Sequence, residues 1–231
     1  MKEINLLTRR SLLKGAGLLT GLSLAPGRLH AAEGGGTPDV SPLEDLMREH
    51  GVLSRVLLIY EEVLGRVRSG RSFPAELLQR SAELIRRFIE DYHEKLEEEY
   101  LFPRFEKAKR LAELVRVLKE QHQAGWRLTD SILGWVQSAE SKEKQDDLKL
   151  ARDLSLFIRM YRPHKAREDT ILFPALHSLV SAKDFERMGD QFEDREKDLF
   201  GENGFGQIVT KVAGMERDLG IFELSRVTPK I

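Results

Sequence analysis

The sequence predicts an all-α protein, in which an up-down antiparallel four-helix bundle is followed by two further helices. Long stretches consist mainly of Leu, Ala, Glu, Lys and Arg, which favour helices, whereas runs of β-branched residues are scarce. Glycine and proline gather at a few places that are expected to separate the helices. With 231 residues, of which 41% are hydrophobic, one domain can bury a substantial core.

The charged residues argue against a nucleic acid or a membrane surface as the partner. They make up 32% of the chain, but acidic and basic residues are interspersed and the formal net charge is only -1. A small partner is therefore favoured over a large polyanion. Cysteine is absent, which excludes disulfides, thiolate metal sites and cysteine nucleophiles. Imidazole and carboxylate remain as the strong metal ligands.

Residues 41–178 are expected to form the bundle. Ser41, Pro42 and Glu44 give a helix start with an N-cap, a proline in the first turn and a capping-box acid. The first helix ends at a turn over 70–74, and Leu-Phe-Pro is expected to end the second and the fourth helix. Short connections make successive helices antiparallel. The second, third and fourth helices are expected at about 74–102, 109–138 and 144–173.

Residues 179–231 are expected to form a helical extension. Two amphipathic helices are predicted at about 182–199 and 205–219, parted by Gly-Glu-Asn-Gly. Their apolar faces are expected to pack on the outside of the bundle. The alternative is that they form a contact between copies of the chain in an oligomer.

Residues 1–32 resemble a twin-arginine export signal, and residues 33–40, with three consecutive glycines, are expected to form a linker. The resemblance rests on the segment TRRSLLKG, which begins at Thr8, and on the apolar stretch 18–25. This stretch is shorter than the roughly 20 apolar residues that span a membrane. The resemblance implies export of the folded protein by the twin-arginine machinery to the periplasm or another extracytoplasmic space. No clean A-x-A cleavage site follows, and an uncleaved signal would anchor the protein to the membrane.

A repeat links the second and the fourth helix. The segment HEKLEEEYLFP begins at His93 and HKAREDTILFP begins at His164, so that a histidine, a glutamate four residues later and the Leu-Phe-Pro ending recur. Each segment is also preceded by a single histidine, His50 or His122, 43 or 42 residues earlier. The bundle is therefore expected to consist of two matched helical hairpins that carry two similar half-sites.

The spacing of these residues predicts that they meet inside the bundle. Residues four apart lie on one helix face, so each repeat histidine points the same way as its glutamate. All four histidines fall on the apolar stripe of their helices. In antiparallel helices, residues equally far from the connecting turn lie level, and the midpoints between these residues fall inside the predicted turns. We therefore expect one layer that holds His50, His93, Glu97, His122, His164 and Glu168.

This layer predicts a metal site. A single histidine on an apolar face is more often a hydrogen-bonded core residue than a ligand. Four imidazoles and two carboxylates buried at one level, however, would carry a large desolvation penalty without a cation. Coordination satisfies their lone pairs, and donors of this kind suit iron, zinc and manganese, among which the spacing alone does not choose. His30, in the export segment, and His177, beyond Pro174, are not expected to be ligands.

The order of these residues resembles the hemerythrin-like, or HHE cation-binding, family. Both show a single His, then His-x-x-x-Glu before Leu-Phe-Pro, then a second single His and a second His-x-x-x-Glu, and the resemblance covers about residues 41–178. It implies an up-down four-helix bundle that holds two irons bridged by carboxylates. Better-known members of the family bind dioxygen reversibly at the less-coordinated iron. By this resemblance the four histidines would be terminal ligands, and Glu97 and Glu168 would bridge.

The sequence departs from the oxygen-carrying members of that family at two positions. Their third helix carries a His-x-x-x-His pair, but here Trp126 stands four residues after His122. Their aspartate five residues after the last ligand histidine corresponds to Asp169, which is kept as the alternative to Glu168. The smaller ligand set is expected either to leave a coordination position open for a small ligand or to weaken the second metal.

The leading hypothesis is a non-catalytic iron protein that binds or senses dioxygen, nitric oxide or iron outside the cytoplasm. A di-iron oxidase or peroxidase is the second hypothesis, and it ranks lower because ferritin-like oxidases use more carboxylates. A structural zinc or manganese bundle is the third. No catalytic residue is assigned, and no cofactor besides the metal is expected.

Overall fold

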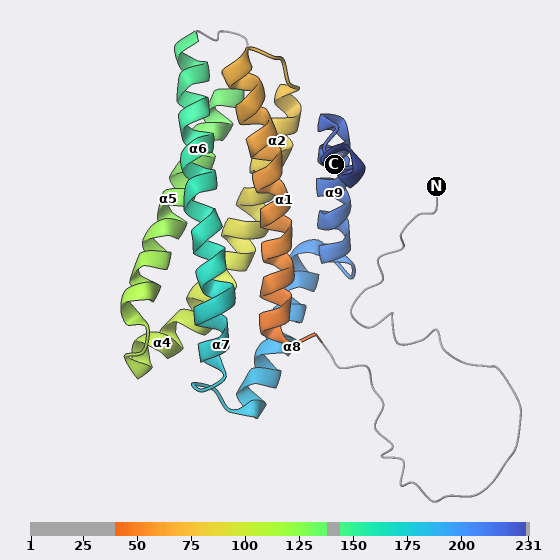
Figure 1. The fold of residues 1–231 in the computed structure, drawn as a ribbon. Coiled ribbons are helices and arrows are strands. Elements are labelled where there is room, and N and C mark those ends of the chain that lie inside the picture. The colour runs from red at the N-terminus through yellow and green to blue at the C-terminus, as the bar shows by residue number, and fades with distance from the viewer. Residues whose placement is uncertain (1–39, 138–143, 230–231) are drawn as a thin grey trace, which may run out of the picture.

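The computed structural model describes residues 40–137 and 144–229, and within these ranges the protein is all-α, as the sequence predicts. Figure 1 shows long helices side by side, with two further helices next to them. The expected export signal and all but the last residue of the expected linker lie outside the described residues. The bundle contains α1 (Pro42–Ser69), a second helix from α2 (Ala75–Leu84) through α3 (Glu94–Leu96) to α4 (Phe102–Ala108), α5 (Ala112–Gln137), and a fourth helix from α6 (Lys144–Arg167) to α7 (Phe173–Leu176).

The first helix begins and ends where the sequence predicts. The Ser41 hydroxyl accepts a hydrogen bond from the backbone N–H of Glu44 at 3.2 Å, and Pro42 occupies the first turn. At the other end Gly70 adopts a left-handed conformation with φ of 66°, which residues with a side chain rarely adopt. This turn reverses the chain into α2.

The four bundle helices form a ring in which each contacts two neighbours. α1 packs against α2 and α6, and α5 packs against the same two helices from the other side. The core between them is made of buried aliphatic and aromatic side chains, among them Leu53, Ile89 and Phe157. The predicted up-down bundle is therefore confirmed.

The expectation that Leu-Phe-Pro ends two helices is wrong. The second helix continues past Pro103 to Ala108, and the fourth continues past Pro174 to Leu176. Each proline lies in the first turn of a new α-helical piece, after a stretch of π-helix. A proline clashes with the i-4 carbonyl of a regular helix, but hydrogen bonds in a π-helix run to the i-5 carbonyl. The wider turn thus accommodates the ring without stopping the helix.

The π-helical backbone coincides with the repeat. One π-helical segment covers Ile85–His93, and two more cover Glu97–Leu101 and Glu168–Leu172. The glutamate of each His-x-x-x-Glu motif is thus the first residue of a five-residue π-helical segment. π-helical turns are rare and occur often at functional sites. From each glutamate onward the two repeats therefore share their backbone conformation, whereas the π-helical segment Ile85–His93 has no counterpart before His164.

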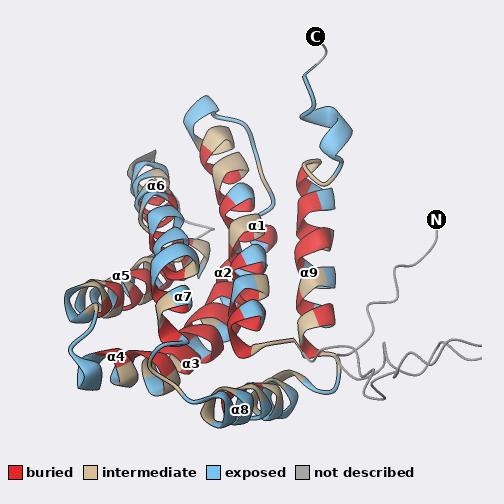
Figure 2. Cartoon of the chain, turned by 60° about the horizontal axis from the view of Figure 1, so that its bottom comes forward, coloured by how far each residue is buried: buried red, intermediate tan, exposed pale blue. Residues whose placement is uncertain are grey.

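The C-terminal extension packs on the bundle, as one of the two predicted alternatives states. α8 (Ala182–Phe200) and α9 (Gly204–Leu219) both contact α1, and α9 also contacts α2. Figure 2 shows that α9 is buried along one side, whereas α8 remains mostly exposed or half-buried. The Arg55 guanidinium donates two hydrogen bonds to the Glu216 carboxylate, at 2.9 and 2.5 Å, and so fastens α9 to α1. A contact between copies of the chain stays a prediction.

Among the described helices, none is both long enough and apolar enough to cross a membrane.

Candidate metal centre

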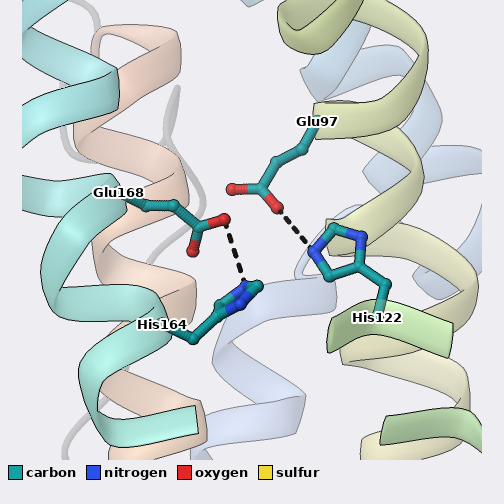
Figure 3. A group of neighbouring side chains, drawn as sticks. All are labelled: Glu97, His122, His164 and Glu168. Atoms are coloured by element: carbon teal, nitrogen blue, oxygen red, sulfur yellow. Dashed lines mark ion pairs between the residues drawn. The ribbon is translucent and has the colours of Figure 1, made fainter. Parts of the chain in front are cut away.

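All six predicted residues lie together in the middle of the bundle. His50 comes from α1, His93 and Glu97 from the second helix, His122 from α5, and His164 with Glu168 from the fourth helix. Their side chains are at most 3% exposed. Figure 3 shows four of them converging from three directions, with both carboxylates turned toward the same space. We call these six residues the donor layer.

The first half-site of the donor layer consists of His50 and His93 with one oxygen from each glutamate. The two imidazole Nε2 atoms lie 3.1 Å apart. His50 Nε2 is 3.3 Å from Glu168 Oε2, and His93 Nε2 is 3.7 Å from Glu97 Oε1. Four donor atoms thus surround one small space.

The second half-site has the same composition. His122 Nε2 lies 3.4 Å from Glu97 Oε2, and His164 Nε2 lies 3.1 Å from Glu168 Oε1. Each glutamate therefore turns one oxygen to each half-site. This is the arrangement of a carboxylate that bridges two metal ions.

The donor atoms fit a pair of transition-metal ions. Donors that sit about 2.1 Å from one ion lie roughly 3.0 to 3.4 Å from one another, and four of the five distances above fall in that range. Both oxygens of Glu97, both oxygens of Glu168 and Nε2 of His122 are buried without a hydrogen-bond partner. A cation satisfies these lone pairs, which would otherwise carry a desolvation penalty.

Without an ion, the charges of the donor layer compensate one another. Burial by itself lowers the pKa of His50, but the hydrogen bond to Asp169 and the Glu168 carboxylate, 3.3 Å from Nε2, outweigh it and raise this pKa to about 10. Burial by itself raises the pKa of Glu168, but His164 and His50 hold it well below its usual range. The metal-free site at neutral pH therefore contains imidazolium and carboxylate groups.

Asp169 lies outside the donor layer, behind His50. Its Oδ1 accepts a hydrogen bond from His50 Nδ1 at 2.7 Å, on the side of the ring away from the half-site. Glu98 has the equivalent place in the first repeat, because its Oε1 accepts from His122 Nδ1 at 3.0 Å. In each repeat, the acid after the motif glutamate thus orients the single histidine of the other hairpin.

The repeat histidines are oriented by residues of their own hairpins. His93 Nδ1 donates to Glu49 Oε2 at 2.7 Å, and His164 Nδ1 donates to Gln121 Oε1 at 2.9 Å. Sequence reasoning missed these two supports. A signal was present, since Glu49 and Gln121 each stand immediately before a single histidine.

The phenylalanine of each Leu-Phe-Pro segment closes the site. Phe173 stacks on the His50 ring with centroids 5.5 Å apart, and Phe102 stacks on the His122 ring at 5.6 Å. Both phenylalanines are fully buried. Each phenylalanine therefore docks on an imidazole of the opposite hairpin.

One corner of the site breaks the symmetry between the hairpins. Trp126, which replaces the usual second histidine of the third helix, donates through Nε1 to Glu94 Oε2 at 2.9 Å. The Tyr161 hydroxyl donates to the other oxygen of Glu94 at 2.7 Å, and the Tyr161 ring lies against His164. The second repeat has Lys165 in place of Glu94. Only the half-site of His122 and His164 therefore has this polar corner beside it.

The other two histidines lie apart from the donor layer. His177 packs its ring against Phe185, with centroids 4.7 Å apart. His30 lies outside the described residues.

The helices α5 and α6 approach each other closely at Gly125, and the packing of Tyr161 there can be tested by substitution. A Cβ atom at Gly125 would lie 2.0 Å from the Tyr161 hydroxyl oxygen and 2.8 Å from its Cζ. Alanine favours a helix interior over glycine by about 1 kcal/mol, but the clash is expected to outweigh this gain. Gly125→Ala should lower the free energy of unfolding of the metal-free protein by about 1 to 3 kcal/mol in urea titrations.

Gly134 on the same helix is the matched control, since a Cβ atom at this position would meet nothing within 4 Å. Gly134→Ala should therefore raise the free energy of unfolding by up to about 1 kcal/mol. Equal stabilisation by both substitutions would contradict the packing of Tyr161 described above.

The comparison with known proteins agrees with this geometry. Residues 41–176 match the family described as hemerythrin HHE cation binding domain, and this segment contains the whole donor layer. Uncharacterized proteins of Mycobacterium tuberculosis strain H37Rv and Mycobacterium bovis are 48% identical to this chain over 204 residues, which cover 85% of it and 80% of each relative. No solved structure matches the chain. Because the family match spans more than half of the chain, this protein belongs to the hemerythrin HHE cation-binding domain family.

Proposed function

We propose that the protein holds two iron ions in the donor layer and binds a small molecule, dioxygen or nitric oxide, at that di-iron centre. The observation that carries the proposal is the division of Glu97 and Glu168, each of which turns one oxygen to each half-site. Nitrogen and carboxylate donors of this kind suit iron, and they also suit zinc and manganese.

The number of protein donors supports a site for a small ligand. Each half-site offers two imidazole nitrogens and two carboxylate oxygens. A six-coordinate ion would therefore keep open positions, as metal sites that bind ligands do. The family resemblance links reversible oxygen carriage to two irons with unequal sets of ligands. Here the two half-sites have the same set of donors, which argues for binding or sensing of the small molecule and against reversible oxygen carriage. Bound iron would supply the redox chemistry, while Phe102 and Phe173 keep bulk water from the histidine rings.

The proposal predicts the metal content and the spectrum of the purified protein. Protein loaded anaerobically with Fe(II) should contain about two irons per chain, and exposure to air should produce a ligand-to-metal absorption band. Glu168→Ala removes one donor from each half-site and should lose most of the iron. Asp169→Ala removes only a hydrogen bond to His50 and should keep two irons, with an affinity lowered by about 10- to 100-fold.

Comparison of Glu168→Ala with Asp169→Ala shows which of these two neighbouring acids is the metal ligand. Loss of iron in Asp169→Ala together with full loading of Glu168→Ala would reverse the assignment. Elemental analysis that finds zinc or manganese after native expression, with no absorption band after Fe(II) loading and air, would refute the iron proposal.

The electrostatics of the donor layer predict how metal affinity depends on pH. The pKa of His50 is raised to about 10, and that of His122 lies well above its usual value because the neighbouring glutamates outweigh burial. Both imidazoles are therefore protonated at neutral pH in the metal-free protein, and a metal must displace these protons. From pH 6 to pH 8 the affinity for Fe(II) should rise, by up to about tenfold per pH unit for each displaced proton.

Anaerobic calorimetric titrations in buffers with different heats of ionisation measure these protons directly. Proton release should accompany Fe(II) binding at pH 7. An affinity that stays constant between pH 6 and pH 8, without proton release, would contradict the assignment of His50 and His122 as ligands.

A di-iron oxidase or peroxidase is the second candidate, and the two buried acids Glu90 and Glu94 favour it. Glu90, one helical turn before Glu94, is fully buried, and burial raises its pKa to about 8. Its Oε2 atom forms an ion pair with Arg86 Nη1 at 2.9 Å, and the same guanidinium also pairs with the exposed Asp130. Such groups supply protons for the reduction of oxygen or peroxide. Sustained turnover of peroxide with a reductant, abolished in His122→Ala, would establish this function in place of ligand binding.

We also propose that the protein acts outside the cytoplasm. The support is the segment from Thr8 to Lys14 with its paired Arg9 and Arg10. Replacement of both arginines by lysine should keep the protein in the cytoplasm, as measured by cell fractionation. Arg28→Lys, outside that segment, serves as the control. Equal export of the double variant and the control would refute the proposal.

A further inference from the structure

A pocket separate from the donor layer lies between the bundle and the C-terminal extension. Its volume is about 300 Å³. One wall comes from α2 and the π-helical segment after it, and the other from the end of α8 and from α9. In Figure 1, α9 runs beside α2. The pocket thus exists because α9 packs alongside α2. Its apolar lining consists of Leu84, Phe88, Phe200, Ile208 and Met215.

The apolar part of the pocket is a floor rather than a surface patch. Leu84, Phe88, Ile208 and Met215 are all buried, and Phe200 is half-buried. The Phe200 ring contacts Phe88 with centroids 5.6 Å apart, so the two walls meet at the bottom of the pocket. Binding of an apolar ligand on a floor of this kind is favourable, because it removes apolar surface from water.

The rim of the pocket carries an excess of positive charge. Arg80 and Arg87 lie on the bundle wall and Lys211 on the α9 wall, opposed by the single acid Glu83. Arg80 is already paired with Asp218 at 2.7 Å. Within residues 40–137 and 144–229, Arg87 and Lys211 form no ion pair. Two cations from opposite walls thus line an apolar cavity, and neither is paired with an acid among the described residues.

We propose that this pocket binds the anion of a medium-chain fatty acid, with its carboxylate between Arg87 and Lys211 and its alkyl chain on the apolar floor. Arginine and lysine both bind carboxylates, and an anion relieves the repulsion between them. The volume suits a single chain of about ten carbons and is too small for a lipid with two long chains. This site is independent of the metal in the donor layer.

Calorimetric titration with decanoate, below its micellar concentration, tests the proposal on the full chain. One decanoate should bind per protein. Octanoate, which is two methylenes shorter, should bind about tenfold more weakly, and decanol, which lacks the charge, should bind at least about tenfold more weakly than decanoate. Arg87→Glu and Lys211→Glu should each lower decanoate affinity at least about tenfold.

Arg127→Glu is the matched control, because Arg127 is an exposed arginine on α5, away from the pocket. It should leave decanoate affinity unchanged. The methionine methyl groups locate the ligand, since the carbon-13 signal of Met215 should shift on titration while those of Met47 and Met160 stay in place. This second measurement does not depend on any variant that fails to fold.

Three outcomes would overturn the proposal. The first is the absence of saturable decanoate binding. The second is decanoate binding that is equally strong in Arg87→Glu, Lys211→Glu and the control Arg127→Glu. A shift of the Met47 methyl signal without a shift of the Met215 signal would count in the same way. The third is a concentration-dependent dimer, seen by sedimentation, in which a second copy of the chain protects Met215 and excludes decanoate.

Discussion

The sharing of two buried glutamates between two pairs of imidazoles is the interaction on which the rest of the structure depends. Glu97 and Glu168 have no exposed surface, and none of their four carboxylate oxygens has a hydrogen-bond partner. Charged groups are stable in such a place only beside opposite charge. The helices must therefore present all donors at one height, and the lengths of the connecting turns follow from this requirement. The hydrophobic core above and below the donor layer keeps water away and so strengthens every interaction within it.

The sequence predicted the donor layer because helical geometry is regular over short distances. A spacing of four residues places His93 with Glu97 whatever the rest of the chain does, and equal distances from a turn place two helices level. The supports behind the histidines were missed for a different reason. Whether Glu49 faces His93 depends on the rotation of α1 against the second helix, which a single periodic stripe does not define. Asp169 shows the same limit, because it adjoins Glu168 in sequence but binds the outer side of His50.

The wrong expectation about Leu-Phe-Pro has a similar origin. Proline stops a regular α-helix, but the local sequence does not reveal that a π-helical turn precedes each proline. The pocket beside α9 was also beyond prediction, since its two walls are more than 100 residues apart in sequence and meet only through tertiary packing. Sequence patterns thus defined which residues carry chemistry within one helix, whereas contacts between helices decided their partners.

The corner formed by Glu94, Trp126 and Tyr161 gives the two half-sites different surroundings despite identical donors. The Glu94 carboxyl group lies 4.0 Å from His122 Nδ1, whereas the other half-site has no counterpart in its repeat, where Lys165 replaces the acid. Such differences in nearby charge and hydrogen bonding change the properties of a bound metal without changing its ligands. The C-terminal helices add to the asymmetry, because they cover α1 and α2 and leave α5 uncovered (Figure 2).

The mutual support between hairpins relates the two halves of the centre to each other. Each hairpin supplies two imidazoles and one glutamate to the centre, and each orients the single histidine of the other through an acid and a phenylalanine. Every one of these contacts maps onto its equivalent when the hairpins are exchanged. The centre therefore has approximate two-fold symmetry, so that a substitution at one support in one hairpin has an equivalent in the other. Trp126 and its hydrogen bond to Glu94 mark the place where this symmetry ends.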